Sequence, residues 1–418
     1  MRTRAVLWAS LVVENIGRLW TMDGSGAHGV GAIDDAVVLI DADRIAWVGP
    51  RAALPIPDLR GVPRLDAGGR AALPGLIDCH THALFMGDRA EEFARRARGE
   101  SYAQIMAAGG GIRSTMRAVR AASLDALCDA TLPRLHQMLS RGVTTVEIKS
   151  GYGLDVDSEL RMLRAARRLG EQQPIDIVTT LLAAHAVPPE HEGDPAAWID
   201  VIVRLLLPEV ASERLATACD VFVEQGAFSA DQARPILVRA RELGLHARVH
   251  AEQLTRSGGA ALAAEVGALS AGHLEHVAPE DIEALARAGV VCEVLALAQV
   301  FLSGQRATPG RAIIDGGCAV AVATDCNPGT AMSTDLPLAA GLAVTQCGLT
   351  VEEALRGVTV NAAAALGLSD RGVIAVGKRA DLVILDASSP IELAYRWGDA
   401  RAHAVVARGR RAYGPGMR

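Results

Sequence analysis

The middle of the chain alternates between short apolar runs and longer stretches in which apolar residues recur every three or four positions. Runs of the first kind predict buried strands, and stretches of the second kind predict amphipathic helices. We expect eight strands, at residues 75–82, 143–150, 175–185, 219–224, 246–252, 268–273, 290–295 and 318–325. Helical patterns lie between them, for example at residues 157–169, 231–243, 258–266 and 279–288. This alternation predicts an α/β fold, a (β/α)8 TIM-like barrel in which the carboxyl ends of all strands share one rim.

Both ends of the chain have a different pattern, with short strand-like runs separated by Gly and Asp clusters. These runs lie at residues 5–13, 36–40, 44–49, 381–385 and 404–407. Neither end is long enough to close a hydrophobic core alone, so we expect both to join in one small β-sandwich domain. The predicted domains are residues 1–72 and 371–418 for the sandwich and 73–370 for the barrel. Residues 83–142, which contain Gly109-Gly110-Gly111, are expected to form a long insertion with a flexible loop near the site.

Composition and charge narrow the class of protein. Half of the 418 residues are hydrophobic and 22% are charged, as in an ordinary globular protein. The formal net charge is -6 with both signs mixed along the chain, which argues against nucleic acid as a partner. Seven scattered cysteines without a Cys-x-x-Cys pair predict free thiols and a cytoplasmic location. No apolar run approaches the roughly 18 residues of a membrane helix, so we expect no membrane partner.

The N-terminal run at residues 5–13 loosely imitates a signal peptide, because two arginines precede it. Glu14 and Asn15 follow it at once, without a convincing cleavage site. We therefore interpret this run as the first strand of the sandwich.

Six polar residues lie where predicted barrel strands end: His80, His82, His185, His250, His273 and Asp325. His80 and His82 are two positions apart, so on a strand both imidazoles point to the same face. A single residue of this kind is commonly a hydrogen-bonded core residue. Six of them on one rim, where barrel active sites lie, are better explained by a functional site.

Four of these residues make a suitable ligand set for a transition metal. His80, His82, His250 and Asp325 offer three imidazoles and one carboxylate, which suit Zn²⁺ or iron rather than Ca²⁺ or Mg²⁺. A metal held in this way lowers the pKa of bound water to about 7 and so supplies hydroxide at neutral pH. Asp325 would accept a proton, and His273 would polarise a carbonyl or protonate a leaving nitrogen. The set predicts hydrolysis of an amide, a cyclic amide or an amidine.

Longer motifs around these residues resemble those of the amidohydrolase superfamily and, more narrowly, of its imidazolonepropionase family. The motifs are Gly87-Asp-Arg89, Ala108-Gly-Gly-Gly-Ile-Arg-Ser-Thr115, Val146-Glu-Ile-Lys-Ser-Gly-Tyr-Gly153, Ala184-His-Ala-Val-Pro-Pro189, His250-Ala-Glu-Gln253, His273-Leu-Glu-His276 and Thr324-Asp-Cys-Asn-Pro-Gly-Thr330. They span the predicted barrel. The resemblance implies the ring opening of 4-imidazolone-5-propanoate by water to N-formimidoyl-L-glutamate, in histidine degradation.

The resemblance also implies contacts with a small substrate that carries a carboxylate. Arg89 would grip the propionate, because a guanidinium pairs with a carboxylate through two hydrogen bonds. The substrate ring would meet Tyr152, His185 and Thr330, and the glutamate end of the product would meet Asn327 and the backbone of Gly329. The resemblance further suggests a homodimer.

Three questions stay open at this level. The ligand set admits both Zn and Fe. Another enzyme of the superfamily, such as a deaminase of a nucleobase or related heterocycle, would use the same metal and His273 without a need for Arg89. A barrel that serves only as a scaffold is disfavoured, because all four candidate ligands are present. The roles of Glu147 and Lys149 are also open, and we favour a buried ion pair between them that shapes the rim.

One position departs from the pattern expected for the family. Some members carry Glu three residues after the histidine of the fifth strand, where this chain has Gln253 beside Glu252. Glutamine orients a substrate or water by hydrogen bonds but cannot accept a proton, so the base is expected to be Asp325.

We therefore predict that Gln253→Ala lowers kcat/KM while the metal content of the protein stays unchanged. Steady-state kinetics and elemental analysis of the same sample check this. Loss of the bound metal in the variant would contradict the assignment.

Overall fold

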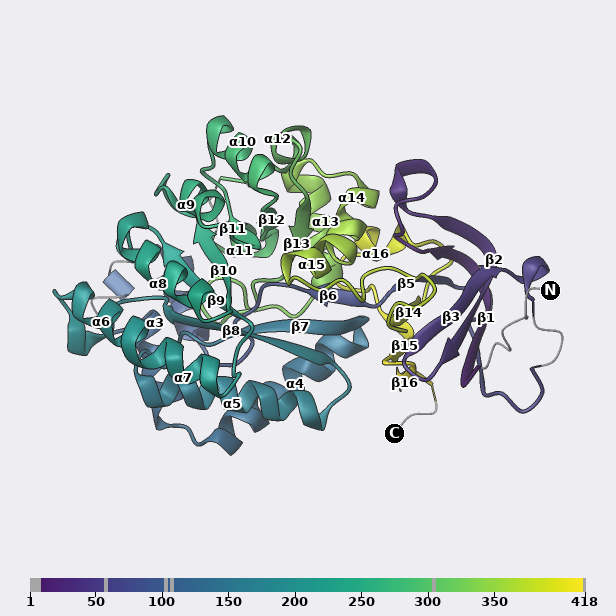
Figure 1. Ribbon diagram of the computed structural model, residues 1–418, viewed down its shortest axis with the longest axis horizontal. Helices are drawn as coiled ribbons and strands as arrows, with labels where there is room; N and C mark the ends of the chain where they lie inside the picture. The colour runs from purple at the N-terminus through teal and green to yellow at the C-terminus, as the bar shows by residue number, and fades with distance from the viewer. Residues whose placement is uncertain (1–8, 56–58, 101–103, 106–108, 303–305, 416–418) are drawn as a thin grey trace.

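The structure is a computed structural model that describes residues 9–55, 59–100, 104–105, 109–302 and 306–415. Two sheets organise it: a barrel formed by the middle of the chain, and a second sheet built from strands of both chain ends (Figure 1). In the described part of the chain, no helix is long and apolar enough to span a bilayer.

The barrel contains eight parallel strands that are paired in chain order, as the apolar runs predicted. They are β6 (Leu76–Asp78), β7 (Val143–Lys149), β8 (Asp176–Ala184), β9 (Ala218–Val223), β10 (His246–Ala251), β11 (Ser270–His273), β12 (Val291–Val294) and β13 (Val320–Val322). All residues of β7, β11 and β12 are buried. Because parallel strands are covered on both faces, no polar and apolar alternation is seen, and even the charged residues Glu147, Lys149 and Glu293 of these strands are buried.

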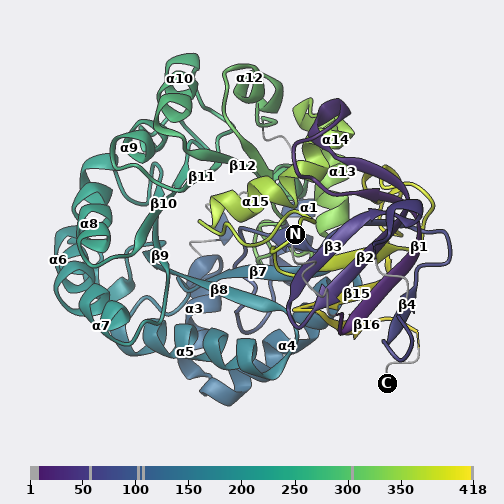
Figure 2. The same ribbon diagram turned by 45° about the vertical axis from the view of Figure 1, so that its right-hand side comes forward.

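Helices surround the strands (Figure 2). The four expected ones are α5 (Val156–Gln172), α8 (Ala230–Glu242), α9 (Gly259–Glu265) and α10 (Pro279–Ala288). The others in this region are α6 (Pro195–Val201), α7 (Leu207–Ser212), α11 (Ala296–Leu302), α12 (Gly310–Asp315), α13 (Leu336–Cys347), α14 (Val351–Gly357) and α15 (Val360–Ala365), with a π-helical turn at Ile202–Leu206. α5 shows why they form: the Asp155 carboxylate caps its first turn, and one face buries Leu160, Leu163 and Leu169.

The barrel closes through short backbone links rather than a long ladder between β13 and β6. A parallel bridge joins Thr81 to Cys326, with hydrogen bonds from Asp325 N to His80 O (3.0 Å) and from His82 N to Cys326 O (3.0 Å). Nearer the base, α15 contacts β6, β12 and β13, and Figure 2 shows it at the centre of the ring of strands. The first and last strands therefore meet at the candidate ligands themselves.

The second sheet has the order β16-β15-β14-β5-β1-β2-β3, with β4 paired to β1. Its strands are β1 (Leu11–Trp20), β2 (Ala32–Asp41), β3 (Arg44–Pro50), β4 (Arg64–Asp66), β5 (Ala71–Pro74), β14 (Leu382–Leu385), β15 (Ala402–Ala407) and β16 (Arg410–Tyr413). A short helix, α16 (Glu392–Tyr395), lies between β14 and β15. β5 pairs with β14, so both chain ends do join in one small domain. The expected strand at residues 5–13 begins only at Leu11, and residues 1–8 lie outside the described chain.

The insertion at residues 83–142 is helical over much of its length, whereas residues 109–111, where the loop was expected, lie outside the helices. It contains α1 (Ala90–Ala97), α3 (Ile112–Ala121) and α4 (Leu124–Ser140). The helical spacing of buried Leu127, Leu135 and Met138 is the signal in the sequence that indicates α4. Gly111 ends the glycine run as the N-cap of α3 at φ 69°, and its N–H donates to Glu92 Oε1 at 2.9 Å.

A cluster of ion pairs fastens the two domains together at the amino end of the barrel. The carboxylate of Asp176, the first residue of β8, accepts hydrogen bonds from Arg371, from Arg379 at 2.8 Å and from Arg408 at 2.5 Å. Burial would raise the pKa of Asp176, but the charges and hydrogen bonds of Arg379 and Arg371 outweigh it and lower the pKa to about 2. The ordinary value is 3.8.

We predict that Asp176→Asn lowers the free energy of unfolding by about 2 kcal/mol or more at pH 7, which follows from the pKa shift. Because the folded pKa is depressed, this stabilisation is present above pH 4 and is lost as the pH falls through about 2. Denaturant unfolding between pH 3 and pH 8 should show the gap between the two proteins narrow in acid. Asp34→Asn, at the exposed Arg18–Asp34 pair, is the control and should change little. A gap independent of pH would contradict the assignment.

Candidate metal centre and active site

All six residues predicted from the strand ends lie at the carboxyl rim of the barrel. His80 and His82 follow β6, His185 follows β8, His250 lies near the end of β10, His273 ends β11, and Asp325 follows β13. His185 is partly covered in its loop, and the other five residues are at most 3% exposed. His246 is the first residue of β10 and therefore lies at the opposite end of the barrel.

The candidate ligand atoms converge on one point. His250 Nε2 lies 3.0 Å from His80 Nε2 and 3.3 Å from His82 Nε2. Asp325 Oδ1 lies 3.8 Å from His80 Nε2 and 3.5 Å from His82 Nε2. Two nitrogens bound tetrahedrally to one zinc ion lie about 3.3 Å apart. The donors therefore fit one metal ion, and the structure brings the predicted set together.

The protonation states also suit a metal. Nδ1 of His80 lies 2.7 Å from Glu293 Oε2, and Nδ1 of His250 lies 3.0 Å from Asp220 Oδ1. Each carboxylate accepts the Nδ1 proton, so Nε2 of each ring is left as the ligand atom. Burial holds the pKa of His80 well below its ordinary value and lowers that of His250 to about 4. The two rings are therefore neutral at pH 7.

Asp325 has both an unusual pKa and an unusual backbone conformation. Burial raises its pKa to about 7, against the opposing charges of His273 and Lys149. A nearby cation favours the carboxylate, while the raised pKa suits a group that accepts and returns a proton. Its φ is 52°, in the left-handed region. His273 and Leu274 share that conformation at 76° and 66°, so the rim stores backbone strain, as functional sites commonly do.

His273 is placed beside an acidic partner. Its Nδ1 lies 3.5 Å from Glu275 Oε1, and both side chains are buried. Burial would lower the pKa of His273, but Glu275 and Asp325 outweigh it and raise the pKa. Thr308 Oγ1 donates to the carbonyl of His273 at 2.8 Å and steadies the strained residue. Glu275 therefore favours the protonated form of the ring, as a proton donor requires.

An aromatic wall flanks the ligands. The His185 ring stacks on His82 with centroids 5.1 Å apart, and Tyr152 lies 5.4 Å from His185 and 5.8 Å from His82. His185 Nδ1 bonds the Gly151 carbonyl at 3.0 Å. Burial and the nearby His250 lower the pKa of His185 to about 3, so this ring is neutral. A flat heterocycle beside the ligands would meet these faces.

Arg89 lies against the turn that follows β13. It is the N-cap of α1, and its Nε donates to Thr115 Oγ1 at 3.0 Å. A Cβ on Gly329 would lie 2.3 Å from Arg89 Nη1, so the guanidinium rests directly on this glycine. Asn327 Oδ1 accepts from Gly329 N and Thr330 N, both at 2.8 Å, which makes the turn rigid.

Gln253 lies partly buried in a loop that two carboxylates hold in place. Glu224 accepts from Leu254 N at 2.8 Å, and Glu252 accepts from Ala260 N at 3.0 Å at the start of α9. Glu224 therefore fixes the loop beside Gln253. The Glu252 carboxylate is likewise engaged in hydrogen bonds to backbone N–H groups, so Gln253 is the neighbouring side chain that could contact a substrate.

Sequence reasoning missed three buried charged residues below the ligands, namely Asp220, Arg248 and Glu293. Each is a single charged residue inside an apolar strand, and this signal could have identified them. Lys149 Nζ lies 2.9 Å from Glu147 Oε1, so the expected ion pair is present.

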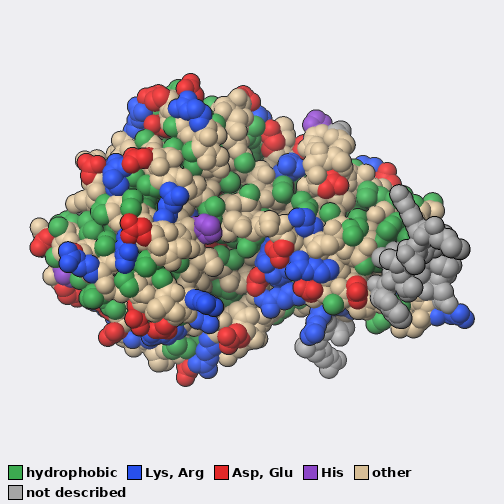
Figure 3. Space-filling view, viewed as in Figure 1, with side chains coloured by type: hydrophobic (Ala, Val, Ile, Leu, Met, Phe, Trp, Pro, Cys, Tyr) green, Lys and Arg blue, Asp and Glu red, His purple; other side chains and the backbone are tan. Residues whose placement is uncertain are grey.

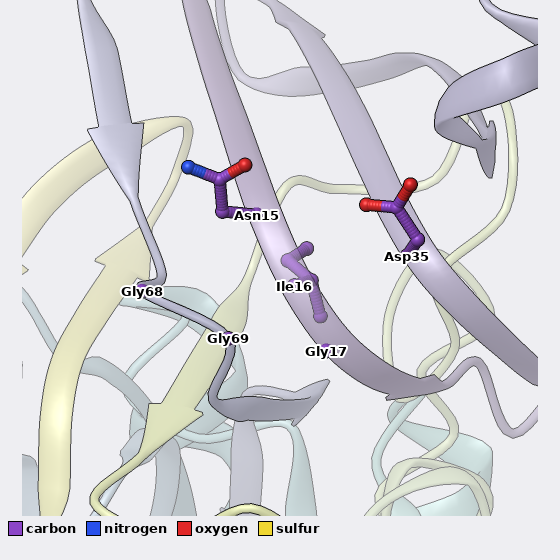
Figure 4. A pocket seen from close by; sticks show the side chains of 6 residues that line it. All are labelled: Asn15, Ile16, Gly17, Asp35, Gly68 and Gly69. Atoms are coloured by element: carbon purple, nitrogen blue, oxygen red, sulfur yellow. The ribbon is translucent and has the colours of Figure 1, made fainter.

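A separate hollow lies in the sandwich domain, lined by Asn15, Ile16, Gly17, Asp35, Gly68 and Gly69 (Figure 4). Its polar side chains have partners on the surface: Asn15 bonds Asp66 at 2.8 Å, and Asp35 pairs with Arg51 at 3.4 Å. The space-filling view shows charges of both signs interspersed over the barrel and sandwich (Figure 3). The chemistry is therefore concentrated at the barrel rim.

Comparisons with known proteins show the family of this chain. The model of the amidohydrolase family matches residues 71–412, so the chain belongs to this family. Imidazolonepropionase from Cereibacter sphaeroides is 51% identical over 92% of this chain and 96% of its own, and that from Paracoccus denitrificans is 47% identical over 94% and 98%. In fold, the chain is similar to 5-methylcytosine deaminase from Klebsiella pneumoniae, with a TM-score of 0.74 and 18% identity over 97% of this chain and 98% of that one.

We predict that His250→Ala lowers bound metal to well below one ion per chain, because His250 Nε2 lies close to two other candidate ligand atoms. His185→Ala removes a neighbouring ring that bonds a backbone carbonyl, and it should keep the metal. Elemental analysis of both variants after gel filtration decides between these outcomes. Full metal content in the His250 variant would remove this residue from the ligand set.

Proposed function

We propose that this protein hydrolyses 4-imidazolone-5-propanoate to N-formimidoyl-L-glutamate, a step in histidine degradation. The main support is the set of curated relatives named imidazolonepropionase, which are 46–51% identical over more than nine-tenths of the chain. The buried histidine cluster and a guanidinium beside it are the parts that this reaction needs.

His80, His82, His250 and Asp325 would hold one zinc or iron ion. Such an ion lowers the pKa of a water ligand and polarises a carbonyl. Asp325 accepts the proton that the attacking water loses. The charged His273 donates a proton to the ring nitrogen as its bond to the carbonyl carbon breaks, so the leaving group departs neutral. The oxygen of water remains on that carbon, which becomes a carboxylate of the product.

Arg89 would bind the propionate of the substrate, with Tyr152 and His185 against the ring. Thr330 and Gln253 would orient the ring edge, and Asn327 with the Gly329 backbone would hold the glutamate end of the product. The Gly329 N–H now donates to Asn327 Oδ1, so the product carboxylate would replace that acceptor. A homodimer and a cytoplasmic location belong to the same proposal. All seven cysteines are buried and unpaired, which supports a reducing compartment.

The main alternative is deamination of a nucleobase or a related heterocycle. The similarity to 5-methylcytosine deaminase concerns the fold, and such a substrate offers no carboxylate for Arg89. Hydrolysis of the imidazolone followed in the ultraviolet, beside guanine and cytosine under the same conditions, separates the two. Release of ammonia from a base, with no turnover of the imidazolone, would overturn the proposal. Elemental analysis of the same sample distinguishes zinc from iron.

We predict that Arg89→Ala and Gly329→Ala both raise KM for the imidazolone by about tenfold or more, as loss of a charged hydrogen bond implies. In Gly329→Ala the new methyl group would occupy the position of the Arg89 guanidinium and displace it. Gly170→Ala in α5, where a methyl group meets only ordinary contacts at 3.6 Å, is the control and should leave KM unchanged. An unchanged KM in Arg89→Ala would remove Arg89 from the propionate site.

A further inference from the structure

Five charged side chains form a continuous ionic chain beneath the candidate metal centre. In order they are Glu293, Arg248, Glu147, Lys149 and Asp220. Signs alternate along it, and successive groups lie 2.5, 3.1, 2.9 and 2.9 Å apart. The residues come from β12, β10, β7 and β9, and each is at most 1% exposed.

Both ends of the ionic chain terminate on candidate ligands. Glu293 Oε2 lies 2.7 Å from His80 Nδ1, and Asp220 Oδ1 lies 3.0 Å from His250 Nδ1. Asp220 Oδ1 also accepts from the backbone N of His250 at 3.1 Å. The rings of two ligands are therefore joined through one buried path. By contrast, His82 Nδ1 has no hydrogen-bond partner among the described residues.

The middle of the ionic chain also holds the ligand backbone. Arg248 Nη2 donates to the carbonyl of Cys79 at 2.6 Å, directly before His80. Glu147 Oε2 accepts from the backbone N of Thr81 at 3.0 Å, between the two histidines. Lys149 is different, because the ion-pair partners of its side chain are the two carboxylates of Glu147 and Asp220. Its contact with the ligand segment is made by the backbone, where Lys149 N donates to the Thr81 carbonyl at 3.0 Å.

Burial of five charged side chains costs folding free energy unless each charge is paired. Proteins in which apolar residues replace such buried ion pairs are commonly as stable. Stability therefore gives little reason for this arrangement in a barrel interior. Three carboxylates and two cations leave one formal negative charge on the ionic chain that contacts His80 and His250. This net negative charge makes burial of the ionic chain less favourable in the absence of a metal ion, and it favours a cation bound by the candidate ligands above.

We propose that the ionic chain acts as one positioning unit for the metal, in which Lys149 joins the Asp220 end to Glu147 and so, through Arg248, to the Glu293 end. It fixes the Nε2 tautomer of His80 and His250 and the backbone between Cys79 and Thr81. The inference rests on the proposed metal site and adds to it a buried set of residues on which metal affinity depends.

Lys149→Met provides the decisive test, because the two effects of lysine have opposite signs. By charge alone, removal of a cation makes the site more negative, and metal should bind as tightly or more tightly. If Lys149 aligns the carboxylates, the affinity should instead fall by about tenfold or more, which is the usual effect of losing outer groups around a metal. Competition against a chelator measures the affinity for Zn²⁺, and the visible spectrum of the Co²⁺-loaded protein reports the ligand geometry.

Glu159→Gln is a matched control, since Glu159 is equally buried and accepts three backbone hydrogen bonds but contacts no ligand. It should lower the melting temperature of the metal-free protein and leave Zn²⁺ affinity and the Co²⁺ spectrum unchanged. If Lys149→Met does not fold, Asp220→Asn and Glu293→Gln test the two ends and should each weaken binding about tenfold. Unchanged or tighter Zn²⁺ binding in folded Lys149→Met, or in both end variants, overturns the inference. Failure of the unaltered protein to bind metal would overturn the proposed function instead.

Discussion

Closure of the barrel is the constraint on which the rest of the structure depends. The first and last strands do not meet along a ladder. They meet where the backbone of His80 and His82 bonds that of Asp325 and Cys326. Asp78 reinforces this seam, because its carboxylate accepts from Thr324 N at 3.0 Å and from Thr324 Oγ1 at 2.6 Å. The contacts that complete the fold are therefore the contacts that place the candidate ligands, and a loose seam would also be a loose metal site.

The interior below the seam departs from the simple rule of an apolar barrel core. Ala, Val and Leu fill the space between strands and helices, whereas charged side chains occupy the axis beneath the site. Such groups tolerate burial only when paired, so their positions are fixed relative to one another. The two ends of the barrel use ion pairs differently. At the amino end three guanidinium groups around Asp176 tie the domains together, and at the carboxyl end the charges lie below the ligands.

Much of the fold and the candidate ligand set could be predicted from the sequence alone, for identifiable reasons. Strands buried on both faces leave unmistakable apolar runs, and a histidine or aspartate at the end of such a run is conspicuous. The helices of the insertion were not predicted, although the buried residues Leu127, Leu135 and Met138 of α4 recur at helical spacing. Arg248 and Asp220 are visible in the sequence as single charged residues inside apolar strands, but their pairing is not. They are direct neighbours in the β9–β10 register, and register between strands is a property of the folded barrel.

The position of Arg89 has a consequence for how such enzymes diverge. The candidate ligands belong to the strands, but Arg89 caps a helix of the segment inserted after the first strand. That helix is anchored at its far end too, where Arg96 donates to the Gly329 carbonyl at 3.2 Å. In the proposed function, recognition of the substrate tail and activation of water would thus reside on different parts of the chain. Evolution can exchange the inserted segment and acquire a new substrate while the reactive centre and its closing seam are inherited intact.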